Sequence, residues 1–497
     1  MAVWTTRLWV VALLAAAVWS AGVMGAEGTW RERMSGLHPS VRECLVELPP
    51  ELLDAGPDVP ETRNAYALWA RGAAVFEPMP ADLRAAVDKA GPSGLPKRER
   101  ARFAEWRSRN KPAWDLFVRG AALKALRRPY RGLMDPLDPP PPPIKSLLDL
   151  SDFALLDALS SGSRDQVVEE LLRRLGAARL LIEDRACVED WLDGVALERT
   201  VVHDIQRNLL PGELPLDAAV AILVRLGEAE PLDAALTRAL AGSFRAQFLS
   251  GLDFLARNNA EGGYENDLLK SLRNAARARL KGADKIAALE ALSQGLLDTR
   301  ETLRLAGALF ERGRADALAP WPRRDRGMDE MAAACDAWAE AAGAKAALEP
   351  VLRRMEEGQM SAEDLAAIRA AIRNIAGKRL AGMMKDCYYL PKAALARAML
   401  RREVLKAQVA IKAFAGRRGE PPQRLQELVD GMFLASVPQD PFGGGPLRYS
   451  RERMLLWSVG PDEKDDGGLD APLDDLRVSS NLEDPGLKDF VWRAPAR

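Results

Sequence analysis

Histidine, cysteine and aromatic residues are all scarce in this chain, and each shortage narrows the chemistry it can carry. The 497 residues include two histidines, four cysteines and 6% aromatic residues. Two histidines exclude most His-rich metal sites and make any Ser-His-Asp arrangement depend on His38 or His203. His203 lies in a helical pattern, so we expect a half-buried side chain paired with a neighbour rather than a catalytic base. So few aromatic residues also give little support to a carbohydrate platform.

The cysteines are too widely separated in sequence for a disulfide scaffold or a paired-Cys zinc site. An even number in an oxidising compartment allows one or two disulfides, with three complete pairings. The alternative is that some are buried small apolar side chains. The sequence does not choose between these readings for Cys44, Cys187, Cys335 and Cys387.

No excess of one charge and no familiar catalytic motif is present. With 70 basic and 71 acidic residues, the chain lacks the uncompensated cations that a dedicated nucleic-acid binder needs. A Gly-rich phosphate loop, a Gly-x-Ser-x-Gly elbow, a His-Glu-x-x-His helix and a Rossmann fingerprint are all missing. An enzyme is therefore the less favoured class, and the alternative is an exported hydrolase that uses carboxylates or His203.

One uncharged run stands at the amino terminus. Residues Leu8 to Ala26 follow Arg7, carry no charge and end in small residues before Glu27, as in a secretory signal peptide. Residues 1–26 are thus predicted to be a cleaved signal, with an uncleaved membrane anchor as the alternative. Either reading predicts export to the periplasm, the cell envelope or the extracellular space.

Helical patterns fill the chain from Glu61 to Gly416, with no strand required. The clearest helix begins at Ser361 and ends at Gly377, and another begins at Ser163. We predict a mainly α protein, an irregular helical bundle or α-solenoid followed by a small α+β domain. Its predicted parts are a helical region at 27–137, a proline-rich linker at 138–143, a central helical domain at 144–390 and an α+β domain at 391–497.

Two segments of the helical region have a sharper alternative reading. The five prolines after Asp138 favour an extended spacer, although a ligand for a proline-binding module has the same composition. Between Lys97 and Lys111, basic residues alternate with aromatic ones, as in nucleic-acid or membrane binders. We favour a solvated helix face, because the aromatic residues fit a buried stripe of helices on either side of Pro112: Phe103, Trp106, Trp114 and Phe117.

The last hundred residues combine a long helix with strand and turn signals. The helix is predicted from Pro391 to Ala415, and its apolar stripe should pack against a small antiparallel sheet. Gly443 to Gly445 provide a tight turn, and Met454 to Val459 are apolar enough for a central strand. The stripe comprises Leu400, Val404, Ala407, Ile411 and Phe414.

These motifs resemble the C-terminal domain of the type II secretion major pseudopilin. The matching residues are Leu428 to Asp430, Val437-Pro438, Asp440 to Gly443, Leu447 to Tyr449 and Ser458 to Asp462. The whole chain also looks like a group of uncharacterised, envelope-directed bacterial proteins that carry such a tail behind a long helical region. True pseudopilins begin with a basic leader and an assembly helix that have no counterpart here, so only the tail fold carries over.

The segment from Asp462 to Asp475 forms an acidic loop, and its density of carboxylates suits Ca²⁺. The resemblance implies that Asp462 and either Asp465 or Asp466 are calcium ligands, with Asp475 or Asp489 closing the site. The alternative is a solvated acidic loop.

The function that these features favour is a non-enzymatic exported scaffold that binds envelope or secretion-system proteins. We expect no nucleic-acid partner, and membrane contact only through an uncleaved N-terminal segment. A filament subunit is a third class, which would polymerise through that segment. The sequence leaves the oligomeric state open.

Overall fold

The computed structural model describes residues 34–54, 59–90, 95–127, 144–184, 187–258, 267–320, 326–340, 342–389, 391–468 and 490–495. The predicted signal or anchor at 1–26 and the proline-rich linker at 138–143 lie outside these ranges.

The first part of the described chain forms several short helices and one long helix that carries the basic and aromatic residues. The elements are α3 (Pro39–Cys44), η1 (Leu45–Glu47), α4 (Pro50–Leu53), η2 (Glu61–Arg63), α5 (Ala65–Val75), α6 (Ala81–Ala90), α7 (Lys97–Ala121) and α8 (Ile144–Ser161).

The central part is helical wherever the structure describes it. Its elements are α9 (Arg164–Glu183), α10 (Val188–Asn208), α11 (Leu216–Gly227), α12 (Leu232–Ser243), the π-helix η3 (Phe244–Leu249), α13 (Ser250–Arg257), α14 (Asp267–Arg279), α15 (Gly282–Ala291), α16 (Thr299–Leu318), α17 (Arg326–Glu340), α18 (Ala342–Glu356), α19 (Ala362–Ile372), α20 (Ile375–Met383) and α21 (Lys385–Tyr389).

The last part begins with the longest helix and ends in short strands. Its elements are α22 (Pro391–Arg418), α23 (Gln426–Asp430), β1 (Gln439–Asp440), β2 (Gly445–Pro446), β3 (Arg448–Ser450), β4 (Leu455–Ser458) and β5 (Phe490–Arg493).

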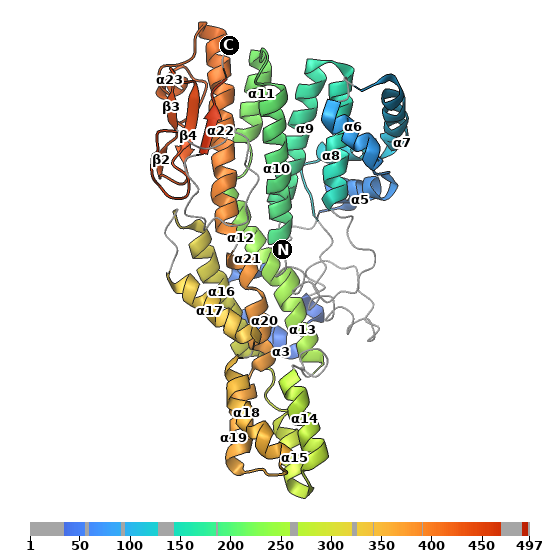
Figure 1. The fold of residues 1–497 in the computed structure, drawn as a ribbon, viewed down its shortest axis with the longest axis vertical. Coiled ribbons are helices and arrows are strands. Elements are labelled where there is room, and N and C mark those ends of the chain that lie inside the picture. Colours follow the sequence, from blue (N-terminus) through green and yellow to red (C-terminus); the bar gives the residue numbers. More distant parts are fainter. Residues whose placement is uncertain are drawn as a thin grey trace.

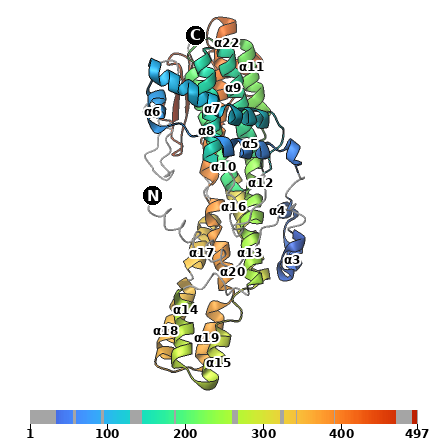
Figure 2. The ribbon, with the colours of Figure 1, turned by 90° about the vertical axis from the view of Figure 1, so that its right-hand side faces the viewer.

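The molecule is elongated, and its two ends differ in width (Figures 1 and 2). At the wide end α9, α10, α11 and α22 run along the long axis, with α5 to α8 on one side and the strands against α22 on the other. Helices α14, α15, α18 and α19 form the narrow end in both views. The architecture is therefore mainly helical with a small antiparallel sheet near the C-terminus, as predicted.

Two predicted helix starts are confirmed by their side-chain caps. Ser163 Oγ accepts a hydrogen bond from the backbone N–H of Gln166 at 3.4 Å. Ser361 and Asp364 form a complete capping box at the start of α19. Such caps satisfy backbone donors that have no partner within the helix.

The predicted end of that second helix at Gly377 is wrong. Helix α19 ends at Ile372, and Asn374 adopts a left-handed conformation with φ of 55° before α20 begins. The buried Asn374 side chain explains the break, because its Oδ1 accepts hydrogen bonds from Asp298 N–H and Thr302 Oγ at 2.9 and 2.8 Å. Distant residues therefore determine this boundary.

The prediction of two separate helices on either side of Pro112 is also wrong, because α7 continues through the proline. A proline inside a helix costs about 3 kcal/mol. Phe103 and Trp106 are buried on one side of Pro112 and Phe117 on the other. We attribute the continuous helix to the burial of these rings, each of which contributes about 2 kcal/mol or more.

The C-terminal strands form a three-stranded antiparallel sheet in the order β3-β4-β5 and a separate ribbon of β1 and β2. The predicted central strand at Met454 to Val459 is confirmed, since Leu456 of β4 pairs with Tyr449 and with Trp492. Gly444, with φ of 63°, makes the turn between β1 and β2. From Glu61 to Arg418, the described residues contain no strand, only one isolated bridge between Asn64 and Ala125.

Helix α22 is shared by three hydrophobic cores. We call them the bundle core, which includes α9 and α10, the middle core, which includes α12 and α16, and the sheet core under β3 to β5. The predicted stripe of α22 is buried in the sheet core, against Phe442, Leu456 and Trp492. Other faces of α22 contribute Leu405, Val409 and Ala413 to the bundle core and Leu395 and Ala398 to the middle core.

Among the described residues, none of the helices combines the length and the apolar character needed to cross a bilayer.

All four cysteines are free thiols. The structure therefore contains none of the disulfides that the sequence allowed.

Candidate functional site

The Asp-Pro-Phe-Gly motif begins with a buried carboxylate that joins the glycine turn to β4. Asp440 is 1% exposed, and its Oδ1 accepts hydrogen bonds from Phe442 N–H at 3.0 Å and Ser458 Oγ at 2.8 Å. Its Oδ2 accepts from Val459 N–H at 2.9 Å. The Asp-Pro-Phe-Gly and Ser-Val-Gly motifs are therefore two halves of one structural contact.

Asp465, a predicted calcium ligand, is engaged by protein donors. Its Oδ1 accepts hydrogen bonds from Trp457 Nε1 and Gly467 N–H, both at 2.9 Å, and Arg448 Nε lies 3.4 Å from Oδ2. The hydrogen bond from Trp457 is the main cause that lowers the pKa of Asp465. These contacts hold the acidic loop against β3 and β4.

The other predicted ligands do not assemble into a metal site within the described residues. Asp462 Oδ1 accepts a hydrogen bond from Lys464 N–H at 3.2 Å. The Asp466 side chain also takes part in a polar or electrostatic interaction within the protein. The described part of the chain contains no group of three or more His, Cys, Asp or Glu side chains placed to hold a metal. Asp475 and Asp489 lie outside the described residues. Calcium binding thus stays a prediction.

Neither histidine sits in a catalytic arrangement. His203 is exposed, contrary to the half-buried position expected for it, because Val202 and Ile205 occupy the buried side of α10. It forms no hydrogen bond with a described residue, and the adjacent Asp204 accepts from Arg174 at 2.6 Å. His38 caps the start of α3 through its side chain.

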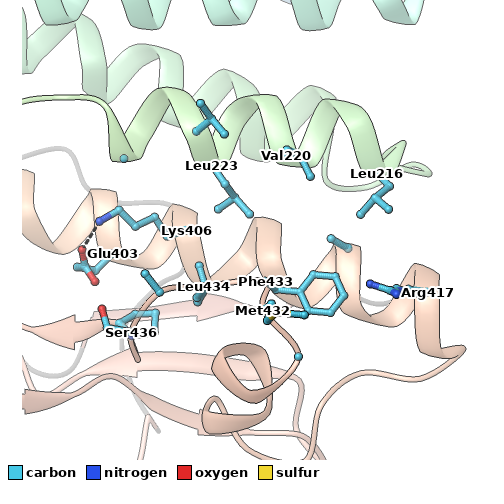
Figure 3. Close-up of a pocket in the computed structure, with 16 residues that line it drawn as sticks. Leu216, Val220, Leu223, Glu403, Lys406, Arg417, Met432, Phe433, Leu434 and Ser436 are labelled. Carbon is cyan, nitrogen blue, oxygen red and sulfur yellow. Dashed lines mark hydrogen bonds and ion pairs between the residues drawn. The ribbon is translucent and has the colours of Figure 1, made fainter.

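An apolar groove of about 560 Å³ lies between α11, α22 and the loop that follows α23 (Figure 3). Leu216, Val220 and Leu223 project into it from α11, and Met432 and Phe433 face them from the loop. Leu216 and Val220 are each 49% exposed, and Met432 is 91% exposed. Large apolar side chains rarely gather on a surface in this way unless something binds there.

Backbone hydrogen bonds fix the loop side of the groove. The Leu428 carbonyl accepts from Phe433 N–H at 2.8 Å and from Leu434 N–H at 3.1 Å. Met432 has a φ of 62°, a strained value for a residue with a side chain. The centre of the Phe433 ring lies 5.5 Å from the centre of the Phe414 ring of α22. These contacts hold Met432 outward and shape the groove wall.

Charged groups mark the two ends of the groove. At one end Lys406 Nζ pairs with Glu403 Oε1 at 2.7 Å, while Glu403 Oε2 accepts from Gln439 N–H at 3.1 Å. At the other end Arg417 is exposed and forms no ion pair with a described residue. The groove therefore offers an apolar floor and, at one end, an exposed arginine that is not paired with any carboxylate in the described part of the chain.

Sequence reasoning did not identify this groove, although a signal existed. Helix α11 has only Asp217 and Arg225 as charged residues, so it is apolar on more than its buried face. The buried face consists of Ala218, Ala219, Ile222 and Leu226. The remaining apolar residues of α11 needed a second partner, which the sequence alone could not locate.

The basic and aromatic segment of α7 fits a solvated helix face over a buried stripe. Phe103, Trp106 and Phe117 are buried. Lys111 Nζ lies 4.1 Å from the centre of the Trp114 ring, and Arg107 pairs with Asp157 and Ser160. Contacts within the protein thus already engage Arg107, Lys111 and Trp114.

The chain matches no protein-family model, no curated protein and no solved structure.

Proposed function

We propose that this protein is a non-enzymatic scaffold whose groove between α11 and α22 receives an apolar helix of a partner protein. The observation that carries the proposal is the row of half-exposed aliphatic residues on α11, Leu216, Val220 and Val224, opposite the exposed Met432. Amphipathic helices bind such grooves through side chains at helical spacing.

The charge at the groove ends specifies the partner further. Arg417 has no ion pair among the described residues, so an acidic side chain near one end of the incoming helix would complement it. The helix would place an apolar stripe against Val220 and Phe433. Burying such residues contributes a hydrophobic term of about 25 cal/mol for each Å² of apolar surface removed from water, part of which offsets the freedom lost on association.

Export and secretion complete the proposed function. The uncharged run from Leu8 to Ala26 supports an exported protein, and the motifs between Leu428 and Asp462 support a pseudopilin-like tail. An envelope or secretion-system protein is accordingly the proposed partner. One wall of the groove is formed by Gly431 to Ser436, which lie between the two segments of the resemblance at Leu428 to Asp430 and Val437-Pro438, and by Pro438 of the second segment.

Site-directed crosslinking tests the proposal. A photoreactive residue in place of Val220 should crosslink one envelope protein in the producing cells. The same residue in place of Ile286, which is 68% exposed on α15, should not. Val220→Asp and Val224→Asp should abolish recovery of that protein from envelope extract, whereas Ile286→Asp should retain it.

Two results would contradict the proposal. One is the absence of any crosslinked partner at Val220, and the other is full recovery of the partner by both aspartate variants. A circular dichroism melt of each variant checks that the substitution has not unfolded α11.

A further inference from the structure

Three arginines gather where α10 packs against α22, on a face of α22 separate from the groove. Arg397 and Arg401 lie one helical turn apart on α22, and Arg199 lies on α10. Arg401 is 7% exposed, Arg397 is half-buried and Arg199 is exposed. The exposed fraction of the three side chains therefore decreases from Arg199 to Arg401 at the contact between α10 and α22, two helices that run side by side in Figure 1.

An adjacent ion pair fixes the position of this cluster. Arg402 Nε and Nη2 donate to the two carboxylate oxygens of Glu198 at 2.6 and 2.7 Å. Both residues are buried, and such a bidentate contact has a defined geometry. Because Arg401 and Arg199 are their immediate neighbours in sequence, this pair also brings the backbone of Arg199 close to that of Arg401.

The cluster lacks a matching negative charge. Among the described residues, Glu198 is the carboxylate whose charge acts on Arg401, and it is already bound to Arg402. Burial, followed by the charges of Arg199 and Arg397, lowers the pKa of Arg401 to about 10. Burial, followed by Arg199, also lowers the pKa of Arg397.

No described residue completes the hydrogen bonding of these arginines. Arg401 Nε is buried without a hydrogen-bond partner, and none of the three forms an ion pair or hydrogen bond with another described residue. A buried N–H donor without an acceptor is costly.

Another buried arginine, Arg174, has hydrogen-bond acceptors for its guanidinium group. Arg174 is fully buried and donates to Ser151, Asp204 and Asp152 at 2.6, 2.6 and 3.1 Å. Arg401 is nearly as buried and has none of these acceptors. Only Nε of Arg401 is buried without a partner, so its terminal N–H groups reach solvent and are open to a bound ligand.

We propose that Arg199, Arg397 and Arg401 bind a phosphate-type oxyanion at the junction of α10 and α22. A tetrahedral oxyanion presents several acceptor oxygens, and guanidinium groups match them with paired N–H donors. The ligand is free phosphate, a soluble phosphoester or the headgroup of an anionic phospholipid, all of which share this chemistry.

Calorimetry with inorganic phosphate in low-salt buffer tests the site. The wild type should bind phosphate, and Arg401→Met and Arg397→Gln should each weaken binding by about tenfold or more. Arg418→Met is the matched control, because Arg418 is an exposed arginine of the same helix outside both the cluster and the groove. It should bind as the wild type does.

Thermal stability separates a binding role from a structural one. Without phosphate, Arg401→Met should melt at the same temperature as the wild type or higher, since it removes an uncompensated buried charge. Phosphate should raise the melting temperature of the wild type and leave that of Arg401→Met unchanged. If Arg401→Met melts lower in both buffers and the wild type does not respond to phosphate, the proposal is overturned.

Vesicle sedimentation identifies the source of the anion. Binding to phosphatidylglycerol vesicles but not to phosphatidylcholine vesicles, lost in Arg401→Met, supports a lipid headgroup. Phosphate binding without vesicle binding supports a soluble ligand. If the wild type binds neither probe, or if both arginine variants bind as well as the wild type, there is no oxyanion site. The groove variants on α11 leave these results unaffected, so the two proposals fail separately.

Discussion

At the residue scale, Glu170 of α9 is a carboxylate with too few partners. It is 2% exposed and pairs with Arg173, while its Oε1 is buried without a hydrogen-bond partner. Burial raises the pKa of Glu170 to about 7, against the lowering effect of Arg173 and Arg174. The loss of hydration therefore raises the pKa of Glu170 by more than the two nearby positive charges lower it.

This shift makes stability depend on pH in a defined direction. The folded-state pKa of about 7 lies above the unfolded value of 4.5, so the folded protein binds the proton more tightly. The stabilising contribution is full below pH 4.5 and is lost as the pH rises to about 7. Glu170→Gln should thus equal the wild type near pH 4.5 and exceed its free energy of unfolding by about 2–3 kcal/mol at pH 8.

Urea unfolding at the two pH values measures this difference. Glu169→Gln is the control, because Glu169 is the neighbouring residue, also contacts Arg173, and has a side chain that is 70% exposed. It should change the free energy of unfolding by less than about 1 kcal/mol at either pH. A Glu170→Gln variant that is less stable than the wild type at pH 8 would show that the ion pair with Arg173 dominates instead.

At the scale of elements, the sequence predicted helix starts better than helix ends. Ser163 and Ser361 cap through residues three positions away, so their signals are local. The break at Asn374 depends on Asp298 and Thr302, more than seventy residues earlier in the chain. In addition, Ile372 and Ile375 keep helical spacing across the break, which hides it from a periodicity argument.

The contact between the glycine turn and β4 has the same non-local origin, and it yields a prediction about stability. Asp440→Ala removes the acceptor for Phe442 N–H and Val459 N–H and should lower the free energy of unfolding by about 3 kcal/mol or more. Asp440→Asn retains one acceptor oxygen and should cost less. Chemical denaturation followed by tryptophan fluorescence measures both, because Trp457 lies on β4.

Asp430→Ala controls for the loss of a carboxylate in the same region. Asp430 is exposed on α23 and accepts one hydrogen bond from Gln426, so its removal should change stability by less than about 0.5 kcal/mol. Equal effects of Asp430→Ala and Asp440→Ala would mean that the buried carboxylate does not join the turn to β4.

At the scale of the whole molecule, the helical body and the C-terminal sheet followed from periodicity and turn residues. The groove did not, because its walls lie about two hundred residues apart, at α11 and at Met432 to Leu434. The arginine cluster has the same character, since Arg199 and Arg401 approach only when α10 packs on α22. The number and order of charged residues in the sequence cannot show which of them lack an oppositely charged neighbour in the folded protein.

The three-sided burial of α22 predicts that the bundle and the sheet unfold together. Ile411 of α22 is fully buried in the sheet core, and Ile411→Ala should lower the free energy of unfolding by about 3 kcal/mol. Because α22 also carries Val409 into the bundle core, amides of both β4 and α10 should exchange faster with solvent. Hydrogen exchange resolved by peptide measures this coupling.

Val351→Ala at the narrow end is the matched control. Val351 of α18 is 1% exposed and lies in the middle core, where α18 packs against α14 and α19. Helix α18 is at the end of the molecule that lies far from β4 (Figure 1). Its loss should accelerate exchange in α14, α18 and α19 and leave β4 unchanged. If Ile411→Ala accelerates exchange in β4 alone, α22 does not couple the cores, and the sheet is a separately stable unit attached to the helical body.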